Sequence, residues 1–335
     1  MLNTDSVFHS RYLPPDVLFQ VLKECVELEK IGRSVAGRPI YALRFGSGPI
    51  KLLAWSQMHG NESTTTRGLF DFYAQIRDDE HYLSQFTFVL IFQLNPDGAQ
   101  AYTRNNANQV DLNRDALAQT QPETRSFMKL LDDFAPDLCL NLHDQRTRFT
   151  VGETQREAAI SFLAPAADEQ CLLTDSRRWA MGLIGHVFDG FNQSVQQRVG
   201  RFDDCFNLNC FGDYLANRSI PTILIEAGQW GTDYDRVLTR RLVSESILGI
   251  AQNCMLNKRK ESLEVKTYLS IPENTQFGYD EGHFDPMSQK LIGVRYNERL
   301  VGDQLLFEVG EQEEIPNQDQ HKVCFRTYYT NSIRP

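Results

Sequence analysis

Several short apolar runs in the sequence end in side chains that can bind a metal ion. His59 and Glu62 follow one such run, His143 closes a second, and Glu226 ends a third. Apolar runs of this length are typical of buried strands, and the carboxyl ends of neighbouring parallel strands meet at one edge of a sheet. Because open α/β sheets bind ligands at that edge, we expect these side chains to converge there.

Predicted helices alternate with predicted strands along most of the chain. The spacing of apolar residues predicts helices over residues 16–30, 63–77, 122–134 and 233–257, and strands over residues 51–55, 86–92, 137–144, 159–163 and 222–225. We expect a turn between two strands at residues 36–38, a second hairpin turn at residues 46–48 and a further turn at residues 94–98. The alternation predicts an α/β fold with a mostly parallel, mixed central sheet and helices on both faces.

The composition changes at about residue 262. Residues 265–271, 289–296 and 321–330 have the pattern of strands separated by Pro, Gly and acidic turns, with no good helix among them. We therefore expect a main domain over residues 1–260 and a small, all-β domain over residues 262–335. Two roles are open for this appendage, which could cover a cleft or mediate self-association.

Charge and hydrophobicity argue against two classes of partner. The 335 residues carry a formal net charge of −10 without a long run of Lys and Arg, so nucleic acid is not an expected partner. Residues 1–15 contain no apolar stretch preceded by basic residues, and the longest apolar stretches are too short to span a bilayer. We expect neither a secretory signal nor a membrane partner.

The cysteines indicate a reducing compartment. There are seven, an odd number, and no pair has Cys-x-x-Cys spacing. Cys25 and Cys139 lie within apolar patterns that are typical of buried thiols. We therefore predict free thiols and a cytoplasmic location, with a bridge between Cys205 and Cys210 as the alternative.

The residue types at the expected site suit a zinc ion. A catalytic zinc ion takes three protein ligands and leaves one position for water. A pair such as His59 and Glu62 arises often by chance, so a third ligand must come from another strand. His143 is the candidate, and its alternative role is that of a core histidine bonded to a backbone carbonyl.

Six sequence elements, in a fixed order, resemble one enzyme family. They are Ile31-Gly32-Arg33-Ser34 with Gly37-Arg38-Pro39-Ile40, His59-Gly60-Asn61-Glu62, Asn95-Pro96-Asp97-Gly98, Asp111-Leu112-Asn113-Arg114, His143 at a strand end, and Glu226. Over about residues 30–255 the chain resembles the zinc carboxypeptidase family, in its bacterial cytoplasmic branch. The resemblance implies a metallocarboxypeptidase, a hydrolase that cleaves a peptide or amide bond next to a free carboxylate.

The resemblance also implies the metal site. His59, Glu62 and His143 correspond to the ligands of one Zn²⁺ ion. Two neutral imidazoles and one carboxylate leave the ion about singly positive, which suits a Lewis acid that must also acidify water. Asp111 matches the residue that orients a zinc-binding histidine, and its alternative role is that of a turn residue.

Four further residues match positions that act on the substrate. Glu226 matches the general base, which takes a proton from zinc-bound water; the alternative is a structural salt bridge at a strand end. Arg104 matches the arginine that polarises the scissile carbonyl. Asn113 and Arg114 match the binders of the terminal carboxylate. The alternative for either arginine is a solvated surface charge or, for Arg114, an ion pair with Asp115.

One feature of the family is missing. Its carboxypeptidases carry a lid tyrosine before the catalytic glutamate, but residues 190–211 contain no tyrosine. Residues 212–214 match a nearby segment that lines the substrate pocket. Three classes of substrate therefore remain as candidates: peptides, murein peptides and acyl-amino acids. The short loop of residues 104–108 favours murein peptides. A catalytically inactive binding module is the alternative from another class.

Overall fold

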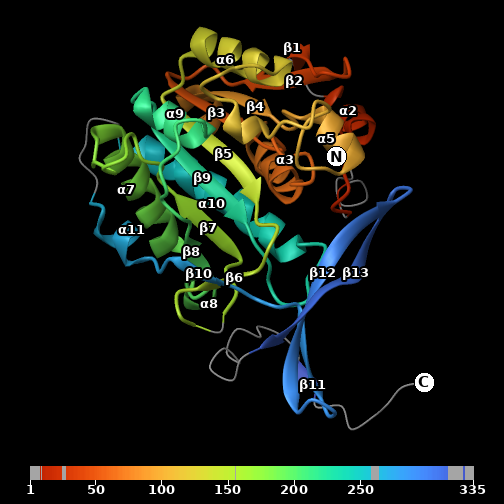
Figure 1. The fold of residues 1–335 in the computed structure, drawn as a ribbon. Helices are drawn as coiled ribbons and strands as arrows, with labels where there is room; N and C mark the ends of the chain where they lie inside the picture. The colour runs from red at the N-terminus through yellow and green to blue at the C-terminus, as the bar shows by residue number, and fades with distance from the viewer. Residues whose placement is uncertain are drawn as a thin grey trace.

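An eight-stranded mixed sheet forms the centre of the computed structural model, which describes residues 8, 10–24, 28–154, 156–257, 264–315 and 327–328 (Figure 1). Its strands are β1 (Leu28–Arg33), β2 (Pro39–Phe45), β3 (Ile50–Trp55), β4 (Phe86–Ile91), β5 (Leu138–Asp144), β7 (Ile160–Leu163), β8 (Val199–Arg201) and β9 (Thr222–Ala227). Across the sheet the order is β1-β2-β4-β3-β5-β9-β7-β8. Strands β4, β3, β5 and β9 run parallel in its middle, whereas β2 and β7 join them antiparallel. The predicted mostly parallel, mixed sheet is confirmed.

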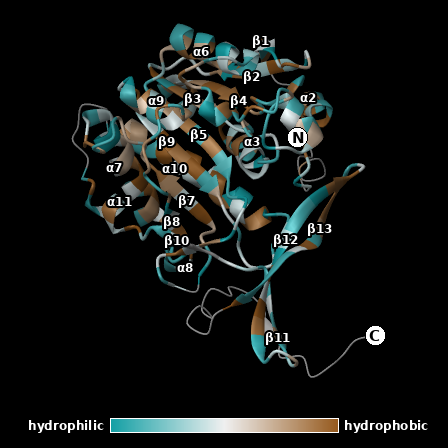
Figure 2. Ribbon diagram, in the orientation of Figure 1, coloured by the Kyte–Doolittle hydropathy of each residue, from teal (hydrophilic) through white to brown (hydrophobic). Residues whose placement is uncertain are grey.

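Helices cover both faces of this sheet, as expected (Figure 1). The helices are α2 (Pro15–Leu22), α3 (Thr64–Ile76), α4 (Glu80–Gln85), α5 (Pro96–Ala101), the short 3-10 helix η1 (Leu112–Arg114), α6 (Pro122–Phe134), α7 (Asp175–Gly190), α8 (Gln193–Gln196), α9 (Phe211–Asn217), α10 (Val237–Leu256) and α11 (Lys266–Ser270). On one face α6 and α9 pack Phe127 and Phe211 against Trp55, and on the other α3 and α10 contribute Phe72 and Ile247. Because both faces are buried, the central strands are hydrophobic almost throughout (Figure 2).

The predicted helix over residues 16–30 is wrong in its second half. Helix α2 ends at Leu22, residues 25–27, with Cys25, lie outside the described residues, and β1 begins at Leu28. Strand β1 pairs antiparallel with β2, with Leu28 opposite Leu43. Pairing with a distant segment has therefore overridden a helical spacing of apolar residues.

Two turn predictions also need correction. Residues 46–48 do connect two strands, but not as a hairpin, because β4 lies between β2 and β3 in the sheet. Residues 94–98 begin a helix rather than forming a turn. Asn95 caps α5 by accepting a hydrogen bond from Gly98 N at 2.9 Å. Helices α7 and α9 were not predicted from the sequence.

The C-terminal part forms a second sheet of four strands. They are β11 (Glu281–Asp285), β12 (Lys290–Val301), β13 (Gln304–Ile315) and β14 (Thr327–Tyr328), in the order β13-β12-β11-β14. Strands β11, β12 and β13 are antiparallel neighbours, whereas β14 pairs parallel with β11. Figure 1 shows β12 and β13 as a long arm beside the main body. The predicted additional β-sheet is confirmed, and much of the predicted strand over residues 321–330 lies outside the described residues.

Residues 264–277 lie against the main body. The predicted strand over residues 265–271 is wrong, because Lys266–Ser270 form helix α11, whose Tyr268 is buried in the core of the main body. Strand β10 (Asn274–Phe277) then pairs with β6 (Phe149–Val151). The division of the chain into two domains stays a prediction. None of the helices in the described residues combines the length and apolar character needed to cross a bilayer.

Candidate metal centre

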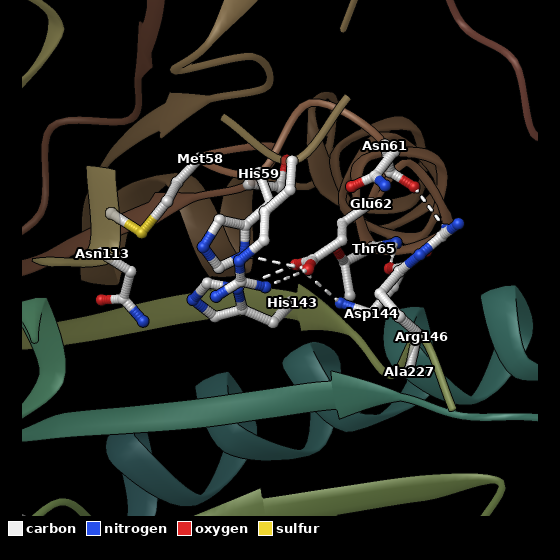
Figure 3. Close-up of polar contacts among 12 residues, drawn as sticks. Met58, His59, Asn61, Glu62, Thr65, Asn113, His143, Asp144, Arg146 and Ala227 are labelled. Atoms are coloured by element: carbon white, nitrogen blue, oxygen red, sulfur yellow. Dashed lines mark hydrogen bonds and ion pairs between the residues drawn. The ribbon is translucent and has the colours of Figure 1, made fainter. Parts of the chain in front are cut away.

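Two imidazoles and one carboxylate meet at the carboxyl edge of the central sheet (Figure 3). His59 Nδ1 is 2.9 Å from Glu62 Oε1, and His143 Nδ1 is 2.8 Å from Glu62 Oε2. The two Nδ1 atoms are 3.2 Å apart, and all three side chains are buried. In the described part of the chain these residues form one group whose ligand atoms all lie within 4.8 Å of one another.

The sheet and helix α3 hold this group in place. Strand β5, which carries His143, lies beside β3, which leads into the loop with Glu62. Asp144 accepts hydrogen bonds from Thr64 N at 2.8 Å and from Thr65 N at 3.0 Å. The end of β5 is thus tied to the first turn of α3, where free N–H groups favour an anion. The N–H group of Asp144 also donates to Glu62 Oε2, at 3.2 Å.

The metal loop, residues 56–63, packs backbone against backbone on α5. A Cβ atom at Gly60 would lie 1.9 Å from the carbonyl carbon of Gly98. Such a contact is impossible without moving one of the two segments, so only glycine fits at this position. The close approach fixes the loop that presents His59 and Glu62.

The contact with Asp111 favours the His59 tautomer whose Nδ1 is unprotonated. Asp111 Oδ1 lies 2.9 Å from His59 Nε2, so Nε2 carries the proton and Nδ1 presents its lone pair toward Glu62 and His143. Burial opposes ionisation of Asp111, but the hydrogen bond with His59 and the charge of Arg104 lower the pKa of its carboxyl group. Two imidazole nitrogens and a carboxylate are a donor set of catalytic zinc. The residues present therefore fit a zinc ion.

Glu226 lies beside the group, on the neighbouring strand β9. It is the register partner of His143, and its side chain is 8% exposed. Burial, together with the negative charges of Glu62 and Asp144, raises the pKa of Glu226 well above its usual value. A carboxylate with a raised pKa next to a cation site is suited to accept and return a proton.

Arg104 and Asp111 form an ion pair at the mouth of the site. Arg104 Nε and Nη2 donate to Asp111 Oδ2 at 3.1 and 2.9 Å, and Nη1 lies 3.5 Å from Glu62 Oε1. The arginine side chain is 43% exposed. Its guanidinium is thus held near the metal group while one edge stays open to a ligand.

Asn113 and Arg114 lie on η1, the 3-10 helix that Asp111 caps. Asn113 Oδ1 accepts a hydrogen bond from Phe211 N at 3.0 Å, which leaves its NH₂ group to donate toward the cavity. Arg114 Nη1 donates to Asn113 O and contacts Cys210 Sγ at 3.1 Å. Asp115 accepts its own hydrogen bonds from Thr120 and Gln121. The alternative ion pair between Arg114 and Asp115 is therefore not formed.

A cavity of about 780 Å³ is lined by most of these residues. Its lining includes every residue proposed from the sequence except Asp111, which lies behind His59. Phe202, Phe206 and Asp213 also line it, and burial raises the pKa of Asp213 to about 6. The segment that matched a pocket-lining region in the sequence thus does line the cavity.

Sequence reasoning missed three residues of this region. Asp144, as described, ties β5 to α3. Asn141 lines the cavity, fully buried, with no hydrogen-bond partner for its side chain among the described residues. Arg146 donates to the carbonyl oxygen of Asn61 at 2.8 Å (Figure 3). Their positions within or just after the predicted strand with His143 were the only signal, because their partners are distant in sequence.

Comparison with known proteins finds similarity to zinc carboxypeptidases. The sequence profile of the zinc carboxypeptidase family matches residues 18–157, which include the three candidate ligands but not Glu226. Carboxypeptidase SOL1 of Arabidopsis thaliana is 28% identical over 162 residues, covering 39% of this chain and 33% of that protein. A Trichophyton verrucosum protein named probable carboxypeptidase 2 is 26% identical over 110 residues, covering 31% of this chain and 20% of that protein. The chain spans a third or less of these curated relatives.

Solved structures share the fold at low sequence identity. A metallo-carboxypeptidase from Pseudomonas aeruginosa, in complex with (2-guanidinoethylmercapto)succinic acid, superimposes with a TM-score of 0.57 at 19% identity, covering 72% of this chain and 70% of that one. Thrombin-activatable fibrinolysis inhibitor gives a TM-score of 0.59 at 13% identity, covering 76% and 77%. The chain is thus similar to the zinc carboxypeptidase family over residues 18–157, and it shares the fold of solved carboxypeptidase structures.

Proposed function

We propose that the protein is a zinc-dependent carboxypeptidase that hydrolyses a peptide or amide bond next to a free carboxylate. One observation carries the proposal, namely that Glu226 lies directly beside the His59, Glu62 and His143 group in a cavity that also contains Arg114. A metal group, a base and a cationic anchor are the three parts that such a hydrolysis needs.

The residues of the chain divide the chemical work among them. When bound by His59, Glu62 and His143, zinc supplies Lewis-acid chemistry and lowers the pKa of water. Glu226 takes up the proton of the attacking water at its carboxylate and delivers it to the leaving amine. Arg104, with one edge open, donates hydrogen bonds to the carbonyl oxygen as negative charge develops there.

The substrate's terminal carboxylate is assigned to Asn113 and Arg114. The NH₂ group of Asn113 and the guanidinium of Arg114 are donors on one short helix at the cavity wall. Charge-assisted hydrogen bonds of this kind contribute about 1.5–3 kcal/mol each. They define the class of substrate as a molecule with a free terminal carboxylate.

The proposed location is the cytoplasm. The cysteines within the described residues, Cys139, Cys171, Cys205, Cys210 and Cys254, are free. The alternative bridge between Cys205 and Cys210 is thus not formed. Free thiols are usual in a reducing compartment.

A substrate panel tests the proposal. Peptides with free and amidated C-termini, murein tetrapeptides and N-acyl-amino acids are incubated with the zinc-loaded protein, and the products are read by mass spectrometry. We expect release of a single C-terminal amino acid from peptides with a free carboxylate, and no release after treatment with a chelator.

Other outcomes identify the rivals. Selective cleavage of the murein peptide would make the protein a murein-peptide amidase, and cleavage of acyl-amino acids alone would make it a deacylase. A zinc-loaded protein that cleaves nothing in the panel would support a binding module instead. The Glu226 carboxylate and the complete ligand group favour an active enzyme.

A further inference from the structure

One carboxylate of the C-terminal sheet reaches into the main body. Glu298, on β12, accepts a hydrogen bond from Arg11 Nη1 at 2.5 Å and from the Tyr102 hydroxyl at 2.7 Å. Its second oxygen also pairs with Arg146 Nη2. The Glu298 side chain is only 12% exposed. Among the described residues, Glu298 is the carboxylate that pairs with both arginines.

One of these partners, Arg146, connects Glu298 directly to the metal loop. Arg146 uses Nη2 for Glu298 and Nη1 for the carbonyl oxygen of Asn61, at 2.8 Å. Asn61 lies between His59 and Glu62 in the chain. In Figure 3 the Arg146 side chain rises from the end of β5 to meet Asn61 beside Glu62. Glu298 thus fixes the guanidinium that holds the backbone of the loop.

The other two partners flank the site as well. The backbone carbonyl of Arg11 accepts a hydrogen bond from the hydroxyl of Ser63, the residue after Glu62. Tyr102 ends α5 in a left-handed conformation, two positions before Arg104. A single, largely buried carboxylate therefore joins three segments that continue into the metal site.

Glu298 also compensates positive charge. Arg11 and Arg236 are buried, and Arg146 lies beside them. Burial opposes ionisation of Glu298, but the charges of Arg11 and Arg146, with Arg236, lower its pKa. Removing the carboxylate would leave the buried Arg11 guanidinium without its ion-pair partner, which is far less favourable than losing an ordinary hydrogen bond.

We propose that Glu298 is a positioning residue for the metal loop, so that the C-terminal sheet completes the metal centre of the main body. The inference rests on the proposed function, because it assigns zinc to His59, Glu62 and His143. Without Glu298, Arg146 turns toward water and releases the Asn61 carbonyl. The loop then loosens, and the ligands must be ordered again when the metal binds.

Zinc affinity, measured by chelator competition, tests the assignment without a turnover assay. We expect Glu298→Gln to raise the dissociation constant for zinc about tenfold, in the range found for residues that orient metal ligands from outside. Excess zinc should restore the turnover of this variant, because Glu226 and Arg104 are unchanged. A merely structural role would lower the melting temperature and leave the dissociation constant unaltered.

Asp280→Asn is the matched control. Asp280 also joins the C-terminal part to the main body, accepting from Arg148 Nε at 2.7 Å, with a side chain 13% exposed. Arg148 in turn contacts Gly231 and Glu157, which lie outside the metal loop. This control should lower the melting temperature while changing the zinc dissociation constant less than twofold. Equal shifts in both variants, or no shift in either, would overturn the proposal.

A milder variant covers the case in which Glu298→Gln does not fold. Tyr102→Phe removes one hydrogen bond to Glu298 and keeps the ring, so we expect a rise of about threefold in the zinc dissociation constant. An unchanged constant in this variant would also overturn the proposal. If the unmodified protein binds no zinc, the proposed function fails instead, which separates the two conclusions.

Discussion

The edge of the central sheet and the C-terminal sheet use charged residues in opposite ways. At the sheet edge, Glu62 belongs to the candidate metal-binding group and Glu226 lies beside it, and both residues are buried. In the C-terminal sheet most charges pair across exposed strands, as Arg299 does with Glu308. Glu298 is the exception, since it lies on β12 beside such pairs and yet packs against the main body with its side chain only 12% exposed. The difference teaches that surroundings, and not residue type or strand pattern, decide which carboxylates can affect function.

The comparison predicts the largest effect for a metal ligand. His143→Ala should lower zinc affinity roughly a hundredfold or more and abolish turnover, because two remaining protein ligands hold an open site poorly. Elemental analysis after dialysis measures the zinc content. His186→Ala, at an exposed position on α7, is the control and should keep full zinc. Full zinc occupancy in His143→Ala would remove this residue from the ligand set.

The next effect separates chemistry from metal binding. Glu226→Gln keeps the shape of the side chain but cannot take up a proton, so turnover should fall about a hundredfold or more. Zinc content should stay unchanged, in contrast to His143→Ala. Steady-state kinetics with parallel elemental analysis gives both numbers. Near-normal turnover would place the base elsewhere.

A smaller effect is expected at the substrate's terminal carboxylate. Amidating that group should lower kcat/KM about tenfold or more, because charge-assisted hydrogen bonds with Arg114 are lost. Arg114→Lys should reduce the same constant for the free peptide, since a point charge cannot replace a two-pronged contact. Arg125→Lys, on the exposed side of α6, is the control. Equal rates on free and amidated peptides would indicate an endopeptidase or a deacylase with another anchor.

The last effect is one of stability and depends on pH. The folded-state pKa of Glu298 is lowered from the usual 4.5, so its contribution to stability is present above that value and is lost as the pH falls through the lower, folded-state pKa. At pH 7, Glu298→Gln should lower the free energy of unfolding by about 3 kcal/mol. Urea unfolding from pH 7 down to pH 3 should show the gap between variant and parent narrowing in acid.

Glu308→Gln provides the contrast within the same sheet. Glu308 is exposed and pairs with Arg299 across the two strands, where water screens the interaction. We expect no measurable change in its unfolding curve at any of these pH values. A loss as large as that of Glu298→Gln would contradict the distinction between the two regions.

The sequence was sufficient to predict elements whose local residue pattern reflects their burial in the fold. Strands β3, β5 and β9 are buried on both faces, so they appear as continuous apolar runs, and His143 and Glu226 near their ends were recognisable. The sequence was insufficient where distant partners decide. Residues 28–30 have helical spacing but pair with β2, and the link between Arg146 and Glu298 joins positions 152 apart. No local pattern contains such a pairing.

The parallel register of the central sheet has a consequence for how the protein folds. His59 and His143 meet although they lie 84 positions apart, and Glu226 comes from a third, still later strand. Contacts between distant segments form slowly, because each requires the closure of a long loop. Helical content should therefore return early during refolding, and high-affinity zinc binding should return only when β3 and β5 have paired and Glu298 has docked against the main body. The return of zinc affinity therefore reports when these distant segments have come together.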